Sequence, residues 1–207
     1  MSTDNPVILS FQDLDIRFTL RGQVLKAIRG ISLDVYRGES LAIVGESGSG
    51  KSVFTKSAMG LLDANGTIAG GHIWYDGKDL TTFTTEKEWL TIRGKEIAMV
   101  MQDPMTSLNP LKTIGAQIEE AVILHQGLRG EAAKKATLEA LAAVGIDEPE
   151  RRYKQYPHEF SGGMRQRVVI AIAVGGRPKI HISDQPTTPL DVANHAPILG
   201  RHKHLHK

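Results

Sequence analysis

The apolar residues of this chain follow a period of two in its first part. Such alternation with polar residues predicts β-strands with one buried face. The alternating apolar positions are Val7, Leu9 and Phe11, then Leu14, Ile16 and Phe18, and then Ile31, Leu33 and Val35. Two short apolar runs, at residues 40–44 and 97–101, instead predict strands buried on both faces, as in a parallel sheet. Further strands are predicted at residues 73–75, before the turn Asp76-Gly77, and at residues 180–182, before Asp184.

The period changes to that of a helix between about residue 112 and residue 165. Apolar residues there recur at intervals of three and four, which predicts helices with one buried face. The first such face comprises Ile114, Ile118, Ala121 and Val122, and the second Leu138, Leu141 and Ala142. Gly145 is expected to cap the second helix at its C-terminus. A further helix is predicted directly after Lys51, so the pattern as a whole predicts an α/β fold.

Composition excludes several kinds of site. The 207 residues include no cysteine, so disulfides, thiolate zinc sites and cysteine nucleophiles are excluded. The absence of disulfides suits a cytosolic protein. The net charge of +2 gives no electrostatic reason to expect a nucleic-acid partner, which normally requires a concentrated basic face. No apolar run approaches the ~20 residues that cross a bilayer, so we expect any association with a membrane to depend on a partner.

Residues 45–52 match the pattern G-x-x-x-x-G-K-[ST] between a predicted strand and a predicted helix. In this context the glycines let backbone N–H groups surround phosphate oxygens. Lys51 is expected to reach the β- and γ-phosphates of a nucleotide, and Ser52 to bind Mg²⁺. The predicted nucleotide-binding residues are Gly45, Glu46, Ser47, Gly48, Ser49, Gly50, Lys51 and Ser52. The alternative is a glycine-rich turn that matches the pattern by chance.

A second glycine-rich turn precedes another predicted helix. Ser161, Gly162 and Gly163 stand at the start of this helix, where they form a second candidate site for an anion. One chain has no use for two phosphate-binding turns unless both meet the same nucleotide from opposite sides. The alternative is an ordinary serine N-cap followed by flexible glycines.

The two turns together resemble the ATP-binding cassette (ABC) family. The segment FSGGMRQR, residues 160–167, is similar to the family's LSGGQ signature. In the family this signature contacts the γ-phosphate of the nucleotide bound by a partner subunit. The resemblance therefore implies such a contact for Ser161, Gly162, Gly163 and Met164.

Further matches follow in the family's order. Gln102 resembles the Q-loop glutamine, which implies contacts with Mg²⁺ and with the attacking water. Asp184 resembles the Walker B aspartate, which implies a further ligand of Mg²⁺ beside Ser52. Leu190 and Asp191 resemble the D-loop, which contacts the opposite subunit. The resemblance extends from about residue 7 to about residue 192.

The resemblance implies an α/β fold with a P-loop NTPase core and a mostly parallel sheet, an N-terminal antiparallel β-subdomain and an inserted α-helical subdomain. We expect one nucleotide-binding domain, in which residues 1–102 form the β-subdomain and P-loop core and residues 103–165 the helical subdomain. Residues 166–192 are expected to return to the core, and residues 193–207 to form an irregular, histidine-rich tail. Because the family's switch histidine lies on a later strand, we expect the chain to be truncated at its C-terminus.

Two longer segments narrow the resemblance to importers of dipeptides and oligopeptides, whose relatives include nickel and glutathione systems. They are QDPMTSLNP, residues 102–110, and YPHEFSGGM, residues 156–164. The family implies ATP and Mg²⁺ as ligands, a second ATP-binding subunit (identical or different), membrane permease subunits and, indirectly, a peptide-binding protein. It also implies a peripheral position on the cytoplasmic face of the cell membrane. The helical segment after Gln102 would receive the coupling helix of the permease; alternatively, residues 103–115 are a solvated loop.

Several residues depart from the family's pattern. Gln185 stands where the family has the glutamate that polarises the attacking water, and an amide accepts no proton. We therefore expect weak or absent ATP hydrolysis, because loss of a general base costs typically about 10²–10⁴ in rate. Leu25 stands where the family has an aromatic side chain that stacks on adenine, for which Phe18 is a weak substitute. His181 interrupts an apolar strand, where burial without a partner is unfavourable.

Three alternatives remain open. A P-loop GTPase or kinase accounts for residues 45–52, but the sequence contains no N-K-x-D guanine motif, and SGGMRQR is left without a role. A subunit that binds ATP, dimerises and never hydrolyses the nucleotide is compatible with Gln185. An incomplete gene product is compatible with the departures that gather after about residue 175.

Overall fold

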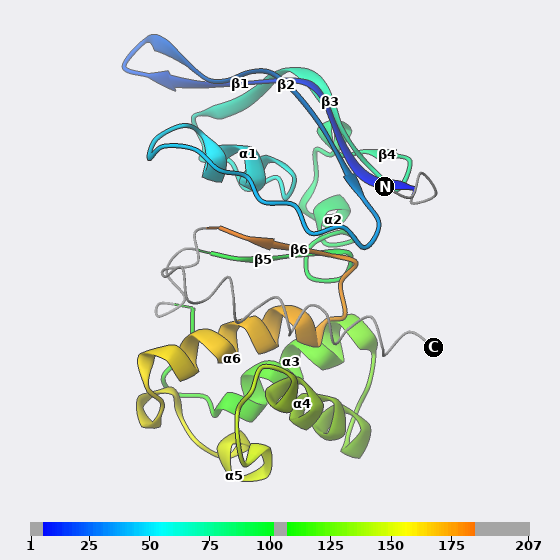
Figure 1. Cartoon of the computed structure of the whole chain (residues 1–207), viewed down its shortest axis with the longest axis vertical. Helices are drawn as coiled ribbons and strands as arrows, with labels where there is room; N and C mark the ends of the chain where they lie inside the picture. Colours follow the sequence, from blue (N-terminus) through cyan, green and yellow to red (C-terminus); the bar gives the residue numbers. More distant parts are fainter. Residues whose placement is uncertain (1–5, 102–106, 185–207) are drawn as a thin grey trace. The chain divides into compact units, whose positions relative to one another are not determined.

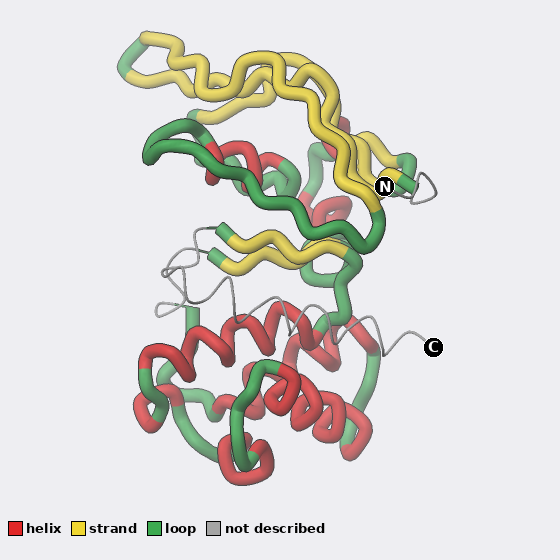
Figure 2. Tube along the Cα trace, in the orientation of Figure 1, coloured by secondary structure: helices red, strands yellow, loops and turns green. Residues whose placement is uncertain are grey.

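The computed structural model describes residues 6–101 and 107–184, in two compact units, Met1–Trp89 and Leu90–Lys207. Figure 1 follows the chain by colour, and Figure 2 shows its helices and strands. The first unit is built on an antiparallel sheet, and the second on helices and a short parallel sheet. The predicted α/β fold, with an antiparallel N-terminal subdomain, a parallel sheet and a group of helices, is confirmed.

Four strands form the antiparallel sheet of the first unit, in the order β2-β1-β3-β4. They are β1 Val7–Leu20, β2 Gln23–Tyr36, β3 Gly66–Tyr75 and β4 Lys78–Asp79. The alternating apolar residues predicted these strands because one face of the sheet is buried, and Leu14, Ile16 and Ile73 on that face are inaccessible to solvent. The turn predicted at Asp76 and Gly77 joins β3 to β4.

Short helices complete the first unit: α1 Lys51–Ser57, the 3₁₀ turn η1 Leu80–Thr82 and α2 Glu86–Trp89. The helix predicted after Lys51 is therefore confirmed. Its Phe54 is buried against Phe11 of β1, with the ring centroids 4.2 Å apart. This aromatic contact holds α1, and the glycine-rich turn that leads into it, against the sheet.

The buried strand predicted at residues 40–44 is not formed. This segment has no regular secondary structure, and Leu41, Ile43 and Val44 are 44%, 42% and 92% exposed. A strand needs a hydrogen-bonded neighbour for its backbone groups, and within residues 6–101 and 107–184 no strand pairs with this segment. The apolar run is present in the sequence, but such a run does not determine whether another strand lies beside it.

In the described part of the second unit, β5 Ile97–Val100 and β6 Ile180–Ser183 form a parallel pair of strands. Both were predicted from their apolar runs. The helices of this unit are α3 Ile114–Gln126, α4 Glu131–Ala143, α5 Pro149–Tyr153 and α6 Gly162–Gly175, with the 3₁₀ turn η3 Pro157–Glu159 before α6. Among the described residues, no helix combines the length and the apolarity that a membrane span requires.

Helices α3, α4 and α6 pack against one another around a shared core (Figure 1). Ile114, Ile118 and Val122 of α3 are inaccessible to solvent, as their spacing predicted. The buried residues of α4 are Ala133, Thr137, Ala140 and Leu141. The predicted face of α4 was therefore displaced by part of a turn, since Ala142 is exposed. Gly145 follows α4 with a φ of 73°, the left-handed conformation that favours glycine after a helix.

Candidate nucleotide-binding site

The turn at residues 45–50 leads directly into α1. Gly48 and Gly50 have φ angles of 80° and 92°, which residues with a side chain rarely adopt. A Cβ at position 50 would also stand 2.9 Å from a side chain of β2. The backbone N–H of Ser49 donates to the carbonyl oxygen of Glu46 at 3.2 Å and closes the turn. Glycine is therefore required for the shape of this loop.

Lys51, the first residue of α1, folds back over this turn. Its ammonium group donates to the carbonyl oxygens of Gly45 and Glu46, both at 2.7 Å, and to the hydroxyl of Ser49 at 3.3 Å. Residues 45–49 are exposed, and the first turn of α1 carries no acidic side chain. A cation held over an exposed glycine turn suits an anionic ligand such as phosphate.

The signature residues form the first turn of α6. Ser161 is its N-cap: the hydroxyl oxygen accepts a hydrogen bond from the backbone N–H of Met164 at 3.3 Å. Gly162 and Gly163 are exposed, and a Cβ at either position would meet no atom of the described residues within 4 Å. Glycine is thus not required here for packing, although it costs a helix up to about 1 kcal/mol relative to alanine. The open space suits the close approach of a group from outside the chain.

The position of this turn is set by the residue before it. Phe160 is 3% exposed, and the guanidinium carbon of Arg152 lies 5.7 Å from its ring centroid. The side chain of Arg165, one turn into α6, donates from Nε to the carbonyl oxygen of Phe160 at 3.0 Å. The contacts of Phe160, which precedes Ser161, and of Arg165, which follows it, therefore fix the position of Ser161.

Asp184 lies at the carboxyl end of the parallel strand pair. It is 7% exposed, and its backbone N–H donates to the carbonyl oxygen of Val100, the last residue of β5, at 3.0 Å. Because parallel strands end at one edge of a sheet, Asp184 stands beside the segment that leads to Gln102. Gln102 itself and Gln185 lie outside the described residues.

The predicted site residues are distributed over both units. Residues 45–52 belong to the first unit, where Ser52 is half-buried in the first turn of α1, and residues 161–164 and Asp184 belong to the second. A shared Mg²⁺ requires Asp184 to lie near Ser52, and this proximity stays a prediction. Because the resemblance implies that Ser161 contacts the nucleotide of a partner subunit, we also expect Ser161 and Lys51 to lie far apart within one chain, which likewise stays a prediction.

Leu25 and Phe18, which were compared with the family's adenine-stacking aromatic residue, lie towards the end of the β1–β2 hairpin. Leu25 is 55% exposed and pairs with Phe18 of β1. Phe18 is only 9% exposed, and its ring covers Gly66, where a Cβ would stand 2.7 Å from the ring. Phe18 is therefore occupied in packing, and the hairpin end presents aliphatic rather than aromatic surface.

Residues 28–188 match the family model described as ABC transporter. The chain belongs to the ABC transporter family. The match spans residues 45–52, residues 161–164 and Asp184, so it covers both glycine turns described above.

Among the relatives of this ABC-family chain are transport ATP-binding proteins. The oligopeptide transport ATP-binding protein AmiE of Streptococcus pneumoniae is 51% identical over 99% of this chain and 58% of its own length. Two proteins of Bacillus subtilis are similar: the oligopeptide transport ATP-binding protein OppD, 51% identical over 97% of this chain and 56% of its own length, and the dipeptide transport ATP-binding protein DppD, 49% identical over 97% and 60%. The chain thus spans a little over half the length of these relatives.

Solved ABC cassettes share the fold. The ATP-binding cassette MJ0796, in a dimeric post-hydrolysis state bound to ADP and Pi, superimposes with a TM-score of 0.80 at 28% identity, over 96% of this chain and 82% of that one. The protein cbiO1 of Clostridium perfringens, part of the ABC transporter complex cbiONQ, gives a TM-score of 0.78 at 26% identity, over 96% of this chain and 75% of that one.

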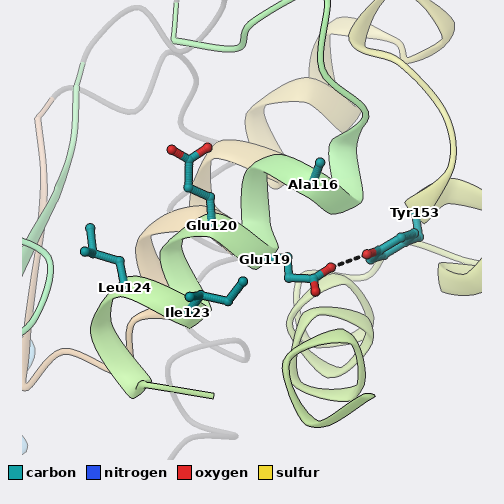
Figure 3. Close-up of a pocket in the computed structure, with 6 residues that line it drawn as sticks. All are labelled: Ala116, Glu119, Glu120, Ile123, Leu124 and Tyr153. Atoms are coloured by element: carbon teal, nitrogen blue, oxygen red, sulfur yellow. Dashed lines mark hydrogen bonds between the residues drawn. The ribbon is translucent and has the colours of Figure 1, made fainter. Parts of the chain in front are cut away.

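An open pocket of 460 Å³ lies on the helical part of this ABC-family chain (Figure 3). Its lining residues are Ala116, Glu119, Glu120, Ile123 and Leu124 of α3 and Tyr153 of α5. The Tyr153 hydroxyl donates to the Glu119 carboxylate, as the dashed line in Figure 3 marks. Burial, together with this carboxylate, raises the pKa of Tyr153 to about 12. Leu124 is 72% exposed, so the pocket has an apolar rim as well as acidic groups.

Sequence reasoning missed two polar residues of the helical core that hold neighbouring segments by specific contacts. Arg152 lies over the ring of Phe160, and Gln117 is 9% exposed on the apolar face of α3. A signal for Gln117 was present, because a polar residue stands between the apolar positions Ile114 and Ile118.

His181 is only half-buried and has a partner, so the penalty expected for a buried unpaired histidine does not arise.

Proposed function

We propose that this chain is the ATP-binding subunit of an importer of dipeptides or oligopeptides, in which binding and hydrolysis of ATP drive uptake. The observation that carries the proposal is the presence of two exposed glycine turns in one chain, at residues 45–50 and 161–163, each leading into a helix. AmiE, OppD and DppD, named as oligopeptide or dipeptide transport ATP-binding proteins, support peptides over nickel or glutathione as the cargo.

Mg-ATP is the proposed ligand of the first turn. Residues 45–52 would surround the phosphates, with Lys51 turning from the carbonyl oxygens of the loop toward the β- and γ-phosphates. The hydroxyl of Ser52 and the carboxylate of Asp184 would hold Mg²⁺, which prefers oxygen ligands, and Gln102 would contact both Mg²⁺ and the attacking water. Bound Mg²⁺ neutralises charge that develops on the transferred phosphoryl group.

A second ATP-binding subunit, identical or different, is the proposed partner of the signature turn. Gly162 and Gly163 face open space, so a phosphate on another subunit can approach the backbone of α6 closely. Ser161 and Met164 would complete this contact. The dimeric state of the cassette MJ0796 bound to ADP and Pi supports an arrangement of this kind.

Membrane permease subunits are the other proposed partners, and through them a peptide-binding protein. The permease would dock on the helical segment that follows Gln102 and hold the chain peripherally at the cytoplasmic face of the membrane. In the proposed domain layout, residues 1–102 form the β-subdomain and P-loop core, and residues 103–165 the helical subdomain. Residues 166–192 return to the core, and residues 193–207 are a histidine-rich tail.

A second candidate function is favoured by Gln185. The amide of this residue can hold a water molecule but cannot accept its proton. The chain would then bind ATP and dimerise, while hydrolysis would be slow or absent. Such a subunit would act through ATP binding alone and rely on a partner subunit for turnover.

Binding and turnover measured side by side test the proposal. We expect the wild-type chain to bind Mg-ATP, Lys51→Ala to weaken that binding strongly, and turnover to fall far below the range of roughly 1–10³ s⁻¹ common among enzymes. Equal binding of ATP by the wild type and by Lys51→Ala would overturn the proposed nucleotide site. Turnover at an ordinary rate would overturn the role given to Gln185 and leave the proposed site intact.

A further inference from the structure

The side chain of Gln117 is bonded entirely to the loop that precedes its own helix. Its amide oxygen accepts a hydrogen bond from the backbone N–H of Asn109 at 2.8 Å. Its amide nitrogen donates to the carbonyl oxygens of Asn109 at 3.1 Å, Lys112 at 3.0 Å and Thr113 at 3.4 Å. The third contact is the weakest, because an amide nitrogen has only two hydrogens. Gln117 thus holds both ends of a loop that spans residues 109–113.

Because Gln117 is buried, the loss of its hydrogen bonds would destabilise the loop. Gln117 is 9% exposed, with its helical neighbours Ile114 and Ile118 completely buried. In such surroundings a lost partner leaves backbone groups without compensation, which costs more than the bond itself contributes. Methionine or leucine would fill this place on the apolar face as well as glutamine does, so core packing alone does not account for Gln117.

The clamped loop is linked to the pocket on α3. Lys112 Nζ lies 2.7 Å from the carboxylate of Glu120, which lines that pocket. Asn109 Oδ1 accepts the backbone N–H of Leu111 at 2.9 Å, and the resulting turn leaves Leu111 85% exposed. One buried side chain therefore holds the loop that carries the exposed Leu111 and the lysine paired with Glu120.

We infer that Gln117 is a positioning residue that couples the nucleotide site to the membrane subunit, by holding the loop of residues 109–113 rigidly on α3. The inference rests on the proposed function, in which the permease docks on the segment after Gln102. Asn109 follows Gln102 by only seven positions in the sequence. A shift at the nucleotide site can reach the docking segment through elements that move together, and the clamp makes residues 109–113 move with α3.

The test uses the full-length protein, alone and assembled with its membrane subunits in lipid vesicles. Gln117→Met keeps the size of the side chain and removes every hydrogen bond, whereas Gln117→Glu keeps the acceptor for Asn109 N–H and loses the donors. Gln126→Met is the matched control, because Gln126 is also an amide on α3 but donates to Gly175, away from the loop. ATP affinity, turnover of the subunit alone and turnover in the assembly are measured for each protein.

Both Gln117 variants are expected to lose roughly fivefold or more of the stimulation of turnover by the membrane subunits, at the lower end of typical coupling between sites. Their ATP affinity and unstimulated turnover should match the wild type, and Gln126→Met should keep its stimulation. Stimulation that survives in both Gln117 variants overturns the inference and leaves the proposed function standing. Equal loss in Gln126→Met also overturns it, because general loosening of α3 then explains the effect.

A wild-type chain that neither binds Mg-ATP nor assembles with the membrane subunits would instead remove the proposed function. Hydrogen exchange tests the clamp without any assembly. The amide of Asn109 should exchange about five times faster or more in Gln117→Met than in the wild type, since one hydrogen bond is lost. Exchange at Asn109 that is as fast in the wild type as in Gln117→Met would contradict the clamp, even if a variant failed to assemble.

Discussion

The ring of Tyr153 lies where a side chain at Gly115 would begin: a Cβ at that position would stand 2.3 Å from Cδ2 of the ring. Gly115 is buried in the first turn of α3, and Tyr153 ends α5. The two helices approach closely only because position 115 lacks a side chain, and this approach carries the Tyr153 hydroxyl to Glu119.

Replacement of Gly115 by alanine should therefore destabilise the protein. The new methyl group must displace the Tyr153 ring, and overpacking of this kind costs typically about 1–3 kcal/mol, partly offset by the better helix propensity of alanine. Denaturant unfolding of Gly115→Ala should show a lower midpoint than the wild type. An unchanged midpoint would mean that the α3–α5 contact is loose.

Gly162→Ala should behave in the opposite way. A Cβ at this position meets no atom within 4 Å, so the free energy of unfolding should stay the same or rise by up to about 1 kcal/mol. Because the proposed role of Gly162 is close contact with the nucleotide of a partner subunit, ATP-dependent dimerisation should weaken in the same variant. A stable variant that dimerises normally would show that the glycine serves no partner.

The hydroxyl of Thr137 is inaccessible to solvent and has no hydrogen-bond partner among residues 6–101 and 107–184. Thr137→Val should raise the free energy of unfolding by about 1 kcal/mol, since valine has a similar shape and buries no unpaired polar group. Thr113→Val is the matched comparison, because the Thr113 hydroxyl oxygen accepts the N–H of Ala116 at the N-cap of α3. That variant should lose about 0.5–2 kcal/mol. Equal effects at the two positions would contradict this account.

Alkaline pH should reveal the environment of Tyr153. Its pKa is raised from 10.0 to about 12 by burial and by Glu119, so between these values the unfolded chain releases a proton that the folded chain keeps. The stability contributed by the protonated group is complete below pH 10 and is lost as the pH rises toward 12. Tyr153→Phe should remove this part of the decline in thermal stability over that window. An identical decline in both proteins would show that Tyr153 titrates normally in the folded state.

Local patterns predicted most of the strands and both glycine turns. The P-loop and the signature depend on neighbours in the sequence: Lys51 reaches carbonyl groups five and six residues away, and Ser161 caps the N–H of Met164 three residues on. The spacing of such residues in the sequence already fixes what they can contact. The helical faces were predicted for the same reason, although the face of α4 was assigned partly to the exposed Ala142.

Long-range pairing could not be predicted in this way. The apolar run at residues 40–44 looked like a buried strand, but whether it becomes one depends on a neighbouring strand that its own sequence does not specify. The contact between Arg152 and Phe160 and the clamp made by Gln117 escaped notice for a related reason. Each joins a helix to a loop whose course only the folded chain reveals.

We propose that one subunit binds ATP at its P-loop and that the signature of the other subunit completes the site. Two variants separate these roles. Lys51→Ala impairs the P-loop and leaves the signature intact. Gly163→Asp places a carboxylate where phosphate would approach, yet suits the start of α6, because the N-terminus of a helix favours a negative charge. Each variant alone should fail to dimerise with Mg-ATP.

Light scattering of an equal mixture of the two variants, with Mg-ATP present, shows whether a P-loop and a signature from different subunits form one site. In a mixed dimer, the intact P-loop of the Gly163→Asp subunit meets the intact signature of the Lys51→Ala subunit, so one complete site forms. We predict ATP-dependent dimers in the mixture and in the wild type, and none with either variant alone. A mixture that stays monomeric under conditions where the wild type dimerises would contradict the account.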